Sequence, residues 1–238
     1  MTVALILAGG KGTRMMKRIP KQFLTICDKP LIVHTLLKFD RCEDVDKIAI
    51  VCLPEYKSYM QALLQEYKVR KAKWIIDGGN SRHCSIKAGI DYLLNESCTN
   101  SDIIIIHNAN MPMITTENIS ECIALCKKGI DIATTAAKCN GYFYEMEGDS
   151  VRIGPDREKM FGAKTPEALK LGSALEIYGL DKFQEKKYES YTAGMLGIEV
   201  GKKVGIVLCD STNIKVTTED DYRLVSTYLS NEKENICI

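Results

Sequence analysis

Residues 2–14 read TVALILAGGKGTR, an apolar run at 2–7 followed at once by a loop that contains three glycines. Because glycine has no side chain, the backbone N–H groups of such a loop can approach phosphate oxygens closely. No acidic residue interrupts the five cations in and just after the loop: Lys11, Arg14, Lys17, Arg18 and Lys21. The stretch predicts a first strand that leads into a polyphosphate-binding loop. The alternative is a surface turn before a solvated basic segment.

Spacing separates three kinds of phosphate-binding loop. The P-loop pattern GxxxxGK[ST] does not occur in this chain. A dinucleotide-binding GxGxxG would need glycine at Met15, and an acidic residue to close the second strand, where the chain has VCL at 51–53. What remains is LAGGxGTRM followed by PKQ at 20–22, which resembles the signature of nucleotidyltransferases that activate sugar or polyol phosphates.

Short apolar runs alternate with amphipathic helices along the chain, the pattern of a parallel sheet covered on both faces. Strands are expected at 2–7, 47–53, 72–76, 102–107, 130–136 and 203–209. Helices are expected near 30–41, 56–67, 82–95 and 116–128. With right-handed crossovers these elements predict an α/β fold, a doubly wound, mostly parallel sheet sandwich. The resemblance of the opening motif implies that this sandwich is of the nucleotidyltransferase (Rossmann-like) type. The length of 238 residues, 45% of them hydrophobic, suits a single domain over 1–238.

Two local patterns add to this fold. In the helix at 56–67, six side chains share one face and are expected in the core: Tyr56, Tyr59, Met60, Leu63, Leu64 and Tyr67. Residues 138–159 are instead polar and aromatic, with turn signals NG at 140–141 and EGD at 147–149. They predict a hairpin arm that protrudes from the sheet.

Charge and cysteine usage exclude several classes of protein. Lys plus Arg total 32 against 31 acids, so the chain lacks the basic excess of a nucleic-acid coat. No basic leader precedes the first strand and no apolar run approaches the ~20 residues that cross a bilayer, so we expect a cytoplasmic protein without a membrane partner. The ten cysteines form no CxxC pair and the three histidines no zinc motif. Reduced thiols are expected, with Cys122 and Cys126 in the core of a helix.

Four further segments follow expected strands, at the sheet edge where ligands of such folds bind. They are GGNSRHCS at 78–85, HNANMP at 107–112, DR at 156–157 with KTPE at 164–167, and NIKVTTED at 213–220. Together with the opening loop, they resemble the cytidylyltransferases that act on 2-C-methyl-D-erythritol 4-phosphate and on ribitol 5-phosphate. Order and spacing match across nearly the whole chain, and GGxxRxxS and NIKVTTxxD are specific to that group.

The resemblance implies roles for the residues at matching positions. It implies nucleotide binding by Ala8, Gly9, Gly10, Lys11, Gly12, Thr13, Gly79, Asn80, Arg82, Ser85 and Asn108. It implies catalysis by Arg14, Lys21 and Lys215, and contacts to the second substrate from Arg157, Thr165, Met111 and Lys215. Two residues have structural alternatives, because Arg157 could pair with a surface acid and Ser85 could cap the helix that follows. Family members commonly pair through the arm, which implies a homodimer with 138–159 at the interface.

Charge determines the implied chemistry. A substrate phosphate whose second pKa is about 6 is mostly dianionic at neutral pH, so it can attack the α-phosphorus of CTP without a general base. Repulsion between anions is the barrier, and cations together with Mg²⁺ on the triphosphate should supply most of the catalysis. Pyrophosphate leaves and a CDP-linked product remains. The implied partners are CTP and a small phosphorylated acceptor, and the implied cofactor is Mg²⁺ or another divalent cation.

The chain departs from the family pattern mainly on the acceptor side. The family has HDAxRP where this chain has HNANMP, so Asn108 replaces a metal-associated aspartate and Met111 a substrate-binding arginine. A neutral amide is a poorer ligand for Mg²⁺, which leaves the metal role of Asn108 open. The usual TPQ is TPE at 165–167, the usual TD is TA at 192–193, and a substrate-contacting threonine is alanine near 136–137. These changes favour a polyol or sugar phosphate acceptor other than methylerythritol phosphate.

Three alternatives stay open from the sequence. The chain could be a catalytically impaired nucleotide-binding paralogue with a regulatory or assembly role. It could act on 2-C-methyl-D-erythritol 4-phosphate in isoprenoid synthesis, or it could select a base other than cytosine. The joint presence of Arg14, Lys21, Arg157 and Lys215 argues against a role in binding alone.

Overall fold

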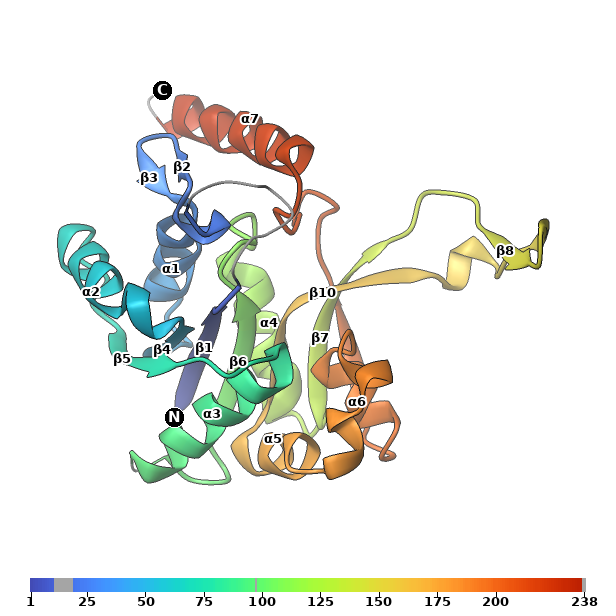
Figure 1. The fold of residues 1–238 in the computed structure, drawn as a ribbon, viewed down its shortest axis with the longest axis horizontal. Coiled ribbons are helices and arrows are strands. Elements are labelled where there is room, and N and C mark those ends of the chain that lie inside the picture. The colour runs from blue at the N-terminus through green and yellow to red at the C-terminus, as the bar shows by residue number, and fades with distance from the viewer. Residues whose placement is uncertain (11–18, 97, 237–238) are drawn as a thin grey trace.

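A seven-stranded sheet forms the centre of the protein, whose computed structural model describes residues 1–10, 19–96 and 98–236 (Figure 1). The strand order is β11-β7-β10-β6-β1-β4-β5. The strands are β1 (Thr2–Ala8), β4 (Lys47–Cys52), β5 (Ala72–Asp77), β6 (Ile103–Asn108), β7 (Ile132–Lys138), β10 (Phe161–Lys170) and β11 (Val204–Leu208). Within this sheet β10 alone is antiparallel to its neighbours, and the other pairs are parallel. The predicted, mostly parallel sheet is confirmed.

Helices cover both faces of the sheet. One face carries α1 (Leu31–Arg41), α2 (Lys57–Glu66) and α4 (Thr116–Lys127), and the other carries α3 (Arg82–Asn95), α5 (Leu171–Tyr178) and α6 (Ala193–Ile198). Alternation along β1 divides its side chains between two fully buried core clusters, with Ala4 and Ile6 in the first and Val3 and Leu5 in the second. Every residue of β6 is buried, as expected for a central strand covered on both sides. The two cores fix the strand ends from which the site is built.

The expected elements form close to their predicted bounds. All six expected strands and all four expected helices are present, with ends that differ by no more than two residues. Met60 and Leu63 on the shared face of α2 are buried as predicted, but the core prediction was wrong for Tyr59, which is 46% exposed. Its ring instead packs edge-to-face on Phe23. The helical periodicity was therefore right, and only the width of the buried face was overestimated.

The sequence pattern did not predict β10. Pro166 lies inside this strand, and proline normally marks an edge or a bulge because it has no N–H to donate. The structure accommodates it at a register shift in the pairing with β7, between Ala163 and Glu167. Also unpredicted are α5, α6, the C-terminal helix α7 (Glu219–Ile236) and two short strands, β2 (Thr25–Ile26) and β3 (Lys29–Pro30).

The predicted arm extends away from the sheet between β7 and β10 (Figure 1). Its tip is a hairpin of β8 (Tyr144–Glu147) and β9 (Ser150–Ile153), and Gly148 in the turn has a φ of +62°, which favours glycine. Every residue of both strands is exposed. Exposure reaches 74% at Tyr144 and 92% at Ile153, so apolar side chains of the arm are left without cover from their own chain.

Helix α7 packs near the segment that follows the opening loop. A small core cluster joins Ile26, Leu31, Val216, Val225 and Leu229. The helix begins with a capping box, in which the Thr218 N–H donates to the Asp221 carboxylate and the Asp221 N–H donates to the Thr218 hydroxyl. This packing holds residues 213–218 beside the first part of the chain.

In the part of the chain that the structure describes, no helix combines the length and apolarity needed to cross a membrane. None of the nine cysteines described there is in a disulfide, and five of them are buried, including Cys122 and Cys126 as predicted. Burial raises the pKa of the Cys52 and Cys126 thiols to about 11. These thiols are therefore protonated and unreactive at neutral pH.

Candidate active site

A cavity of about 830 Å³ opens beyond the carboxyl ends of β1, β4, β5 and β6. Its lining brings together ten predicted site residues: Ala8, Gly9, Gly10, Lys21, Gly79, Asn80, Arg82, Ser85, Asn108 and Lys215. The predictions for Lys11, Gly12, Thr13 and Arg14 lie outside the described residues. Segments from both ends of the chain thus meet at the sheet edge where a ligand was expected.

Gln22 holds the start of the opening loop. This residue is 3% exposed, and its Nε2 donates to the carbonyls of Ala8 at 2.6 Å and Gly10 at 3.1 Å. The two bonds fix the path of residues 8–10, and Lys21, the neighbour of Gln22, lies on the cavity wall. The sequence pattern assigned a role in PKQ to the lysine only and missed the glutamine.

The glycine segment at 78–79 is held in place by Ser85, a residue of α3. Ser85 Oγ accepts from the Gly79 N–H at 3.1 Å and donates to the Gly79 carbonyl at 3.3 Å. A Cβ at Gly79 would lie 2.5 Å from the Cβ of Cys84, so any larger residue would displace the start of the helix. The N-cap of α3 is Ser81, which accepts from the Cys84 N–H at 3.0 Å. Ser85 is therefore not the helix cap, and it orders the loop that lines the cavity.

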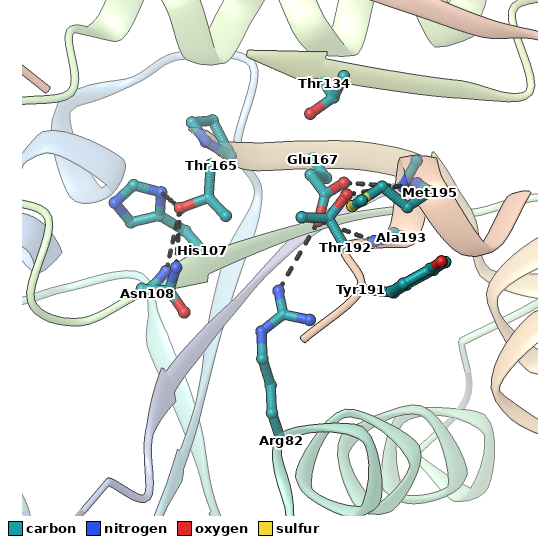
Figure 2. Close-up of polar contacts among 12 residues, drawn as sticks. Arg82, His107, Asn108, Thr134, Thr165, Glu167, Tyr191, Thr192, Ala193 and Met195 are labelled. Carbon is teal, nitrogen blue, oxygen red and sulfur yellow. Dashed lines mark hydrogen bonds and ion pairs between the residues drawn. The ribbon is translucent and has the colours of Figure 1, made fainter. Parts of the chain in front are cut away.

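Asn108, the last residue of β6, lies on the cavity wall with 9% of its surface exposed. Its Nδ2 is 3.3 Å from Thr165 Oγ1 (Figure 2) and 3.5 Å from Met111 Sδ. Thr165 and Met111 are 4% and 1% exposed, and neither lines the cavity. Contacts of these two residues with the acceptor therefore stay predictions. Both residues contact the Asn108 side chain from the protein interior.

His107 lies beneath Asn108 and is fully buried. Its Nδ1 is 3.0 Å from Thr165 Oγ1, and its Nε2 is 2.9 Å from the Met111 carbonyl. Burial lowers the pKa of His107 to about 4, against the opposing effect of its hydrogen bonds to Met111 and Thr165. The imidazole is therefore neutral at physiological pH. No role for His107 was predicted from the sequence, although its place at the end of a buried strand was a usable signal.

Glu167 is a buried carboxylate on β10, two residues after Thr165. It has no exposed surface and accepts from the N–H groups of Ala193 at 3.0 Å and Gly194 at 2.8 Å, where α6 begins. The Arg82 guanidinium lies 3.7 Å from this carboxylate, and 23% of the Arg82 side chain is exposed (Figure 2). Arg82 was predicted to bind the nucleotide. Although it reaches the cavity wall, it directs its charge to Glu167 and so joins α3 to β10 and α6.

Lys215 is brought to the cavity by the backbone of residues 213–217. The Val216 N–H donates to the Asn110 carbonyl at 2.9 Å, and the Asn110 side-chain amide donates back to the Val216 carbonyl. This reciprocal pair ties the segment to the loop that leaves β6. Lys215 therefore lines the same cavity as Lys21, although the two lysines come from opposite ends of the chain.

Arg157 is not part of this cavity. It lies in the arm, with its guanidinium 4.6 Å from the centre of the Tyr142 ring and its Nε 3.5 Å from Glu158. This geometry matches the alternative in which Arg157 pairs with a surface acid. Contact with the second substrate stays a prediction for this residue.

Several lining residues were missing from the predicted site. Those with polar side chains are Gln22, Glu55, Ser81, Asn110, Glu189 and Thr217. Glu55 and Asn110 follow the ends of β4 and β6, so the rule that ligands bind beyond strand ends was a signal for both. Glu189 lies in a turn far from any strand end and carried no such signal.

Few groups are available to hold a metal ion. The described ranges contain no cluster of three or more His, Cys, Asp or Glu side chains suited to a metal. Asn108 offers one neutral oxygen, and Mg²⁺ in nucleotide sites typically takes one or two protein ligands and completes its shell with phosphate and water. This donor set fits a cation carried by a triphosphate and does not fit a free-standing metal site.

The family model of 2-C-methyl-D-erythritol 4-phosphate cytidylyltransferase (IspD) matches residues 2–231. The chain belongs to this family. Ribitol-5-phosphate cytidylyltransferase of Lacticaseibacillus paracasei is 30% identical over 236 residues, which cover 98% of this chain and 100% of that protein. 2-C-methyl-D-erythritol 4-phosphate cytidylyltransferase of Geobacillus kaustophilus is also 30% identical, over 95% of this chain and 96% of that protein. The predicted family and enzyme class, a nucleotidyltransferase, are confirmed.

Solved structures of other proteins share the fold of this chain. The 4-diphosphocytidyl-2C-methyl-D-erythritol synthase of Anaerococcus prevotii has a TM-score of 0.81 at 20% identity, with 97% of this chain and 96% of that chain covered. The 2-C-methyl-D-erythritol 4-phosphate cytidylyltransferase of Thermus thermophilus has a TM-score of 0.72 at 20% identity, with 96% and 98% covered. The predicted nucleotidyltransferase type of sheet sandwich is thereby confirmed.

Proposed function

We propose that this protein transfers CMP from CTP to the phosphate of a polyol or sugar phosphate, releasing pyrophosphate and giving a CDP-linked product. The main support is the convergence of Lys21, Lys215 and the backbone of residues 8–10 and 79–80 on one cavity. Two separate cations beside glycine backbone suit a triphosphate. They also suit the negative charge that gathers when a second phosphate approaches it.

The reaction requires no general base from the protein, since an acceptor phosphate with a second pKa of about 6 is dianionic at neutral pH. One of its oxygens attacks the α-phosphorus of CTP, the bond from that phosphorus to the bridging oxygen breaks, and pyrophosphate leaves with the electron pair. Lys21 and Lys215 offset the repulsion between the two anions. Mg²⁺, when bound, would neutralise triphosphate charge, and Asn108 is the residue that would meet it.

For the acceptor we propose ribitol 5-phosphate or a related polyol phosphate. Relatives of about the same identity are named for ribitol 5-phosphate and for 2-C-methyl-D-erythritol 4-phosphate, so the latter is the second candidate. Met111 supports a change of acceptor, because an apolar side chain that is 1% exposed cannot pair with a phosphate as an arginine would.

A pyrophosphate-release assay tests the proposal. CTP, Mg²⁺ and a panel that includes ribitol 5-phosphate and 2-C-methyl-D-erythritol 4-phosphate should give release with at least one polyol phosphate. Replacement of CTP by UTP or GTP should abolish most of it. If CTP binds and no acceptor gives pyrophosphate release, the alternative of a catalytically impaired nucleotide-binding protein is favoured. The reason to consider this alternative is that Asn108 stands in place of the aspartate of the family pattern.

We also propose that two copies pair through the arm. Large apolar side chains cover the arm and are exposed in the single chain: Tyr142, Tyr144, Met146 and Ile153. The wild-type protein should sediment as a dimer, and the variant Tyr144→Ser with Ile153→Ser should sediment as a monomer, because the interface loses apolar area. Tyr92→Ser, on the surface of α3, is the control. A wild-type monomer, or a variant that stays dimeric, would contradict this interface.

We place the protein in the cytoplasm, with no nucleic-acid or membrane partner. None of the nine described cysteines is in a disulfide, and this many thiols outside disulfides are typical of a reducing compartment.

A further inference from the structure

The side chain of Asn108 can face the cavity in two ways. An amide presents either its NH₂ group or its oxygen, and only the oxygen can meet a cation or accept a hydrogen bond. A carboxylate at this position would offer an oxygen in both orientations. An aspartate, which the family pattern has at this position, needs no particular orientation. Asparagine does, because its amide must be held with the oxygen toward the cavity.

The hydrogen bonds behind Asn108 have only one consistent direction. The Met111 carbonyl can only accept, so the His107 proton is on Nε2, 2.9 Å away. The ring is fully buried and both of its hydrogen-bond partners are neutral, so it carries a single proton, and Nδ1 accepts from the Thr165 hydroxyl at 3.0 Å. Met111 Sδ, 3.2 Å from the same hydroxyl, is the weaker acceptor. The Thr165 proton is therefore directed to His107.

Once Thr165 has donated to His107, its Oγ1 turns lone pairs toward Asn108. Both the Nδ2 of Asn108 at 3.3 Å and its backbone N–H at 3.4 Å can donate to this oxygen. The reverse amide orientation would place the oxygen of Asn108 against lone pairs of Thr165 Oγ1 and Met111 Sδ, with no hydrogen bond to compensate. In Figure 2 the Asn108 oxygen points away from Thr165.

We propose that His107 and Thr165 are positioning residues that lock the amide of Asn108 with its oxygen toward the cavity. The purpose of this lock rests on the proposed function, in which the oxygen meets the cation or a donor beside the triphosphate. Its geometry does not rest on that function. Thr165, which the family resemblance placed against the acceptor, acts here through Asn108.

The orientation is measurable without substrate, by hydrogen exchange of the Asn108 side-chain amide in NMR spectra. The signals are assigned by their loss in Asn108→Asp. They should exchange about tenfold or more slowly than those of Asn95, which is exposed on α3, because a hydrogen-bonded amide must open first. Thr165→Val, which keeps the shape and removes the hydroxyl, should abolish this protection, and Thr165→Ser should restore it. An unprotected Asn108 amide in the wild-type protein would overturn the lock, even if the valine variant failed to fold.

A double-mutant cycle separates positioning from a structural role. Thr165→Val should weaken binding of CTP with Mg²⁺ by about tenfold in calorimetry, the effect of one misplaced polar contact. In the Asn108→Asp background the same change should cost less than about twofold, because the carboxylate needs no orientation. Equal losses in the two backgrounds would overturn the proposal. A wild-type protein that binds no CTP would contradict the proposed function, and the exchange measurement would still decide the orientation.

Discussion

Replacement of Lys215 by methionine should lower kcat/KM for CMP transfer by about 10²- to 10³-fold, the usual effect of removing one preorganised group that faces developing negative charge. Methionine keeps most of the side-chain length and removes the charge. Lys215 is exposed, and its neighbour Val216, which is fully buried, anchors the segment. The fold should therefore be unchanged. Initial rates of pyrophosphate release at low CTP and low acceptor measure the effect.

Lys203→Met provides a matched control. Lys203 is also exposed, and it does not line the cavity. The control should retain the wild-type rate and the same unfolding temperature as Lys215→Met. A loss for Lys215→Met no greater than that of the control would contradict the catalytic role of Lys215.

Replacement of Glu167 by alanine should lower the free energy of unfolding by about 3 to 5 kcal/mol, because it removes a fully buried carboxylate and leaves the partly buried Arg82 guanidinium without it. Two N–H groups of α6 would lose their acceptor as well, at Ala193 and Gly194. Urea unfolding followed by circular dichroism measures the loss. Glu167→Gln should fall between alanine and wild type, since its amide oxygen can still accept from one N–H but carries no charge opposite Arg82.

The pairing itself is tested by adding Arg82→Met. Each single replacement leaves a charged or polar partner buried, whereas the double replacement removes both charges. The double variant should therefore lose clearly less stability than the sum of the two single losses. Strict additivity would show that the 3.7 Å separation of Arg82 and Glu167 carries no interaction energy.

The sheet could be predicted from sequence because its strands carry a local signal. IIII at 103–106 and IAIV at 48–51 are short apolar runs between helical patterns. Each predicts a strand from the local sequence alone, without knowledge of its neighbours in space. β10 carries no such signal. KTPE at 164–167 contains a proline, a lysine and a glutamate. It lies in a strand only because residues beside it are paired: 161–163 with β7, and 167–169 with both β6 and β7.

The same distinction holds for the site. Residues 8–10, 79–80 and 215 could be placed because topology brings strand ends and their loops to one edge of the sheet. The direction in which a side chain turns could not be predicted. Arg82 turns to Glu167, and Met111 turns into the core beside Asn108. Both outcomes depend on partners in β10, the strand whose existence had no local signal.

The position of β10 between β6 and β7 also determines when β7 can be joined to the earlier strands during synthesis. β6 and β7 emerge from the ribosome first, but each keeps an open edge until residues through Lys170 follow. The arm is made in that interval, between the two strands that will later enclose β10. Unpaired strand edges promote aggregation, and long-range antiparallel pairing is slow. A nascent chain that stops before Phe161 therefore has the strands β5, β4, β1 and β6 on one side and β7 alone on the other, and one that reaches Lys170 can join them through β10 before β11 is made.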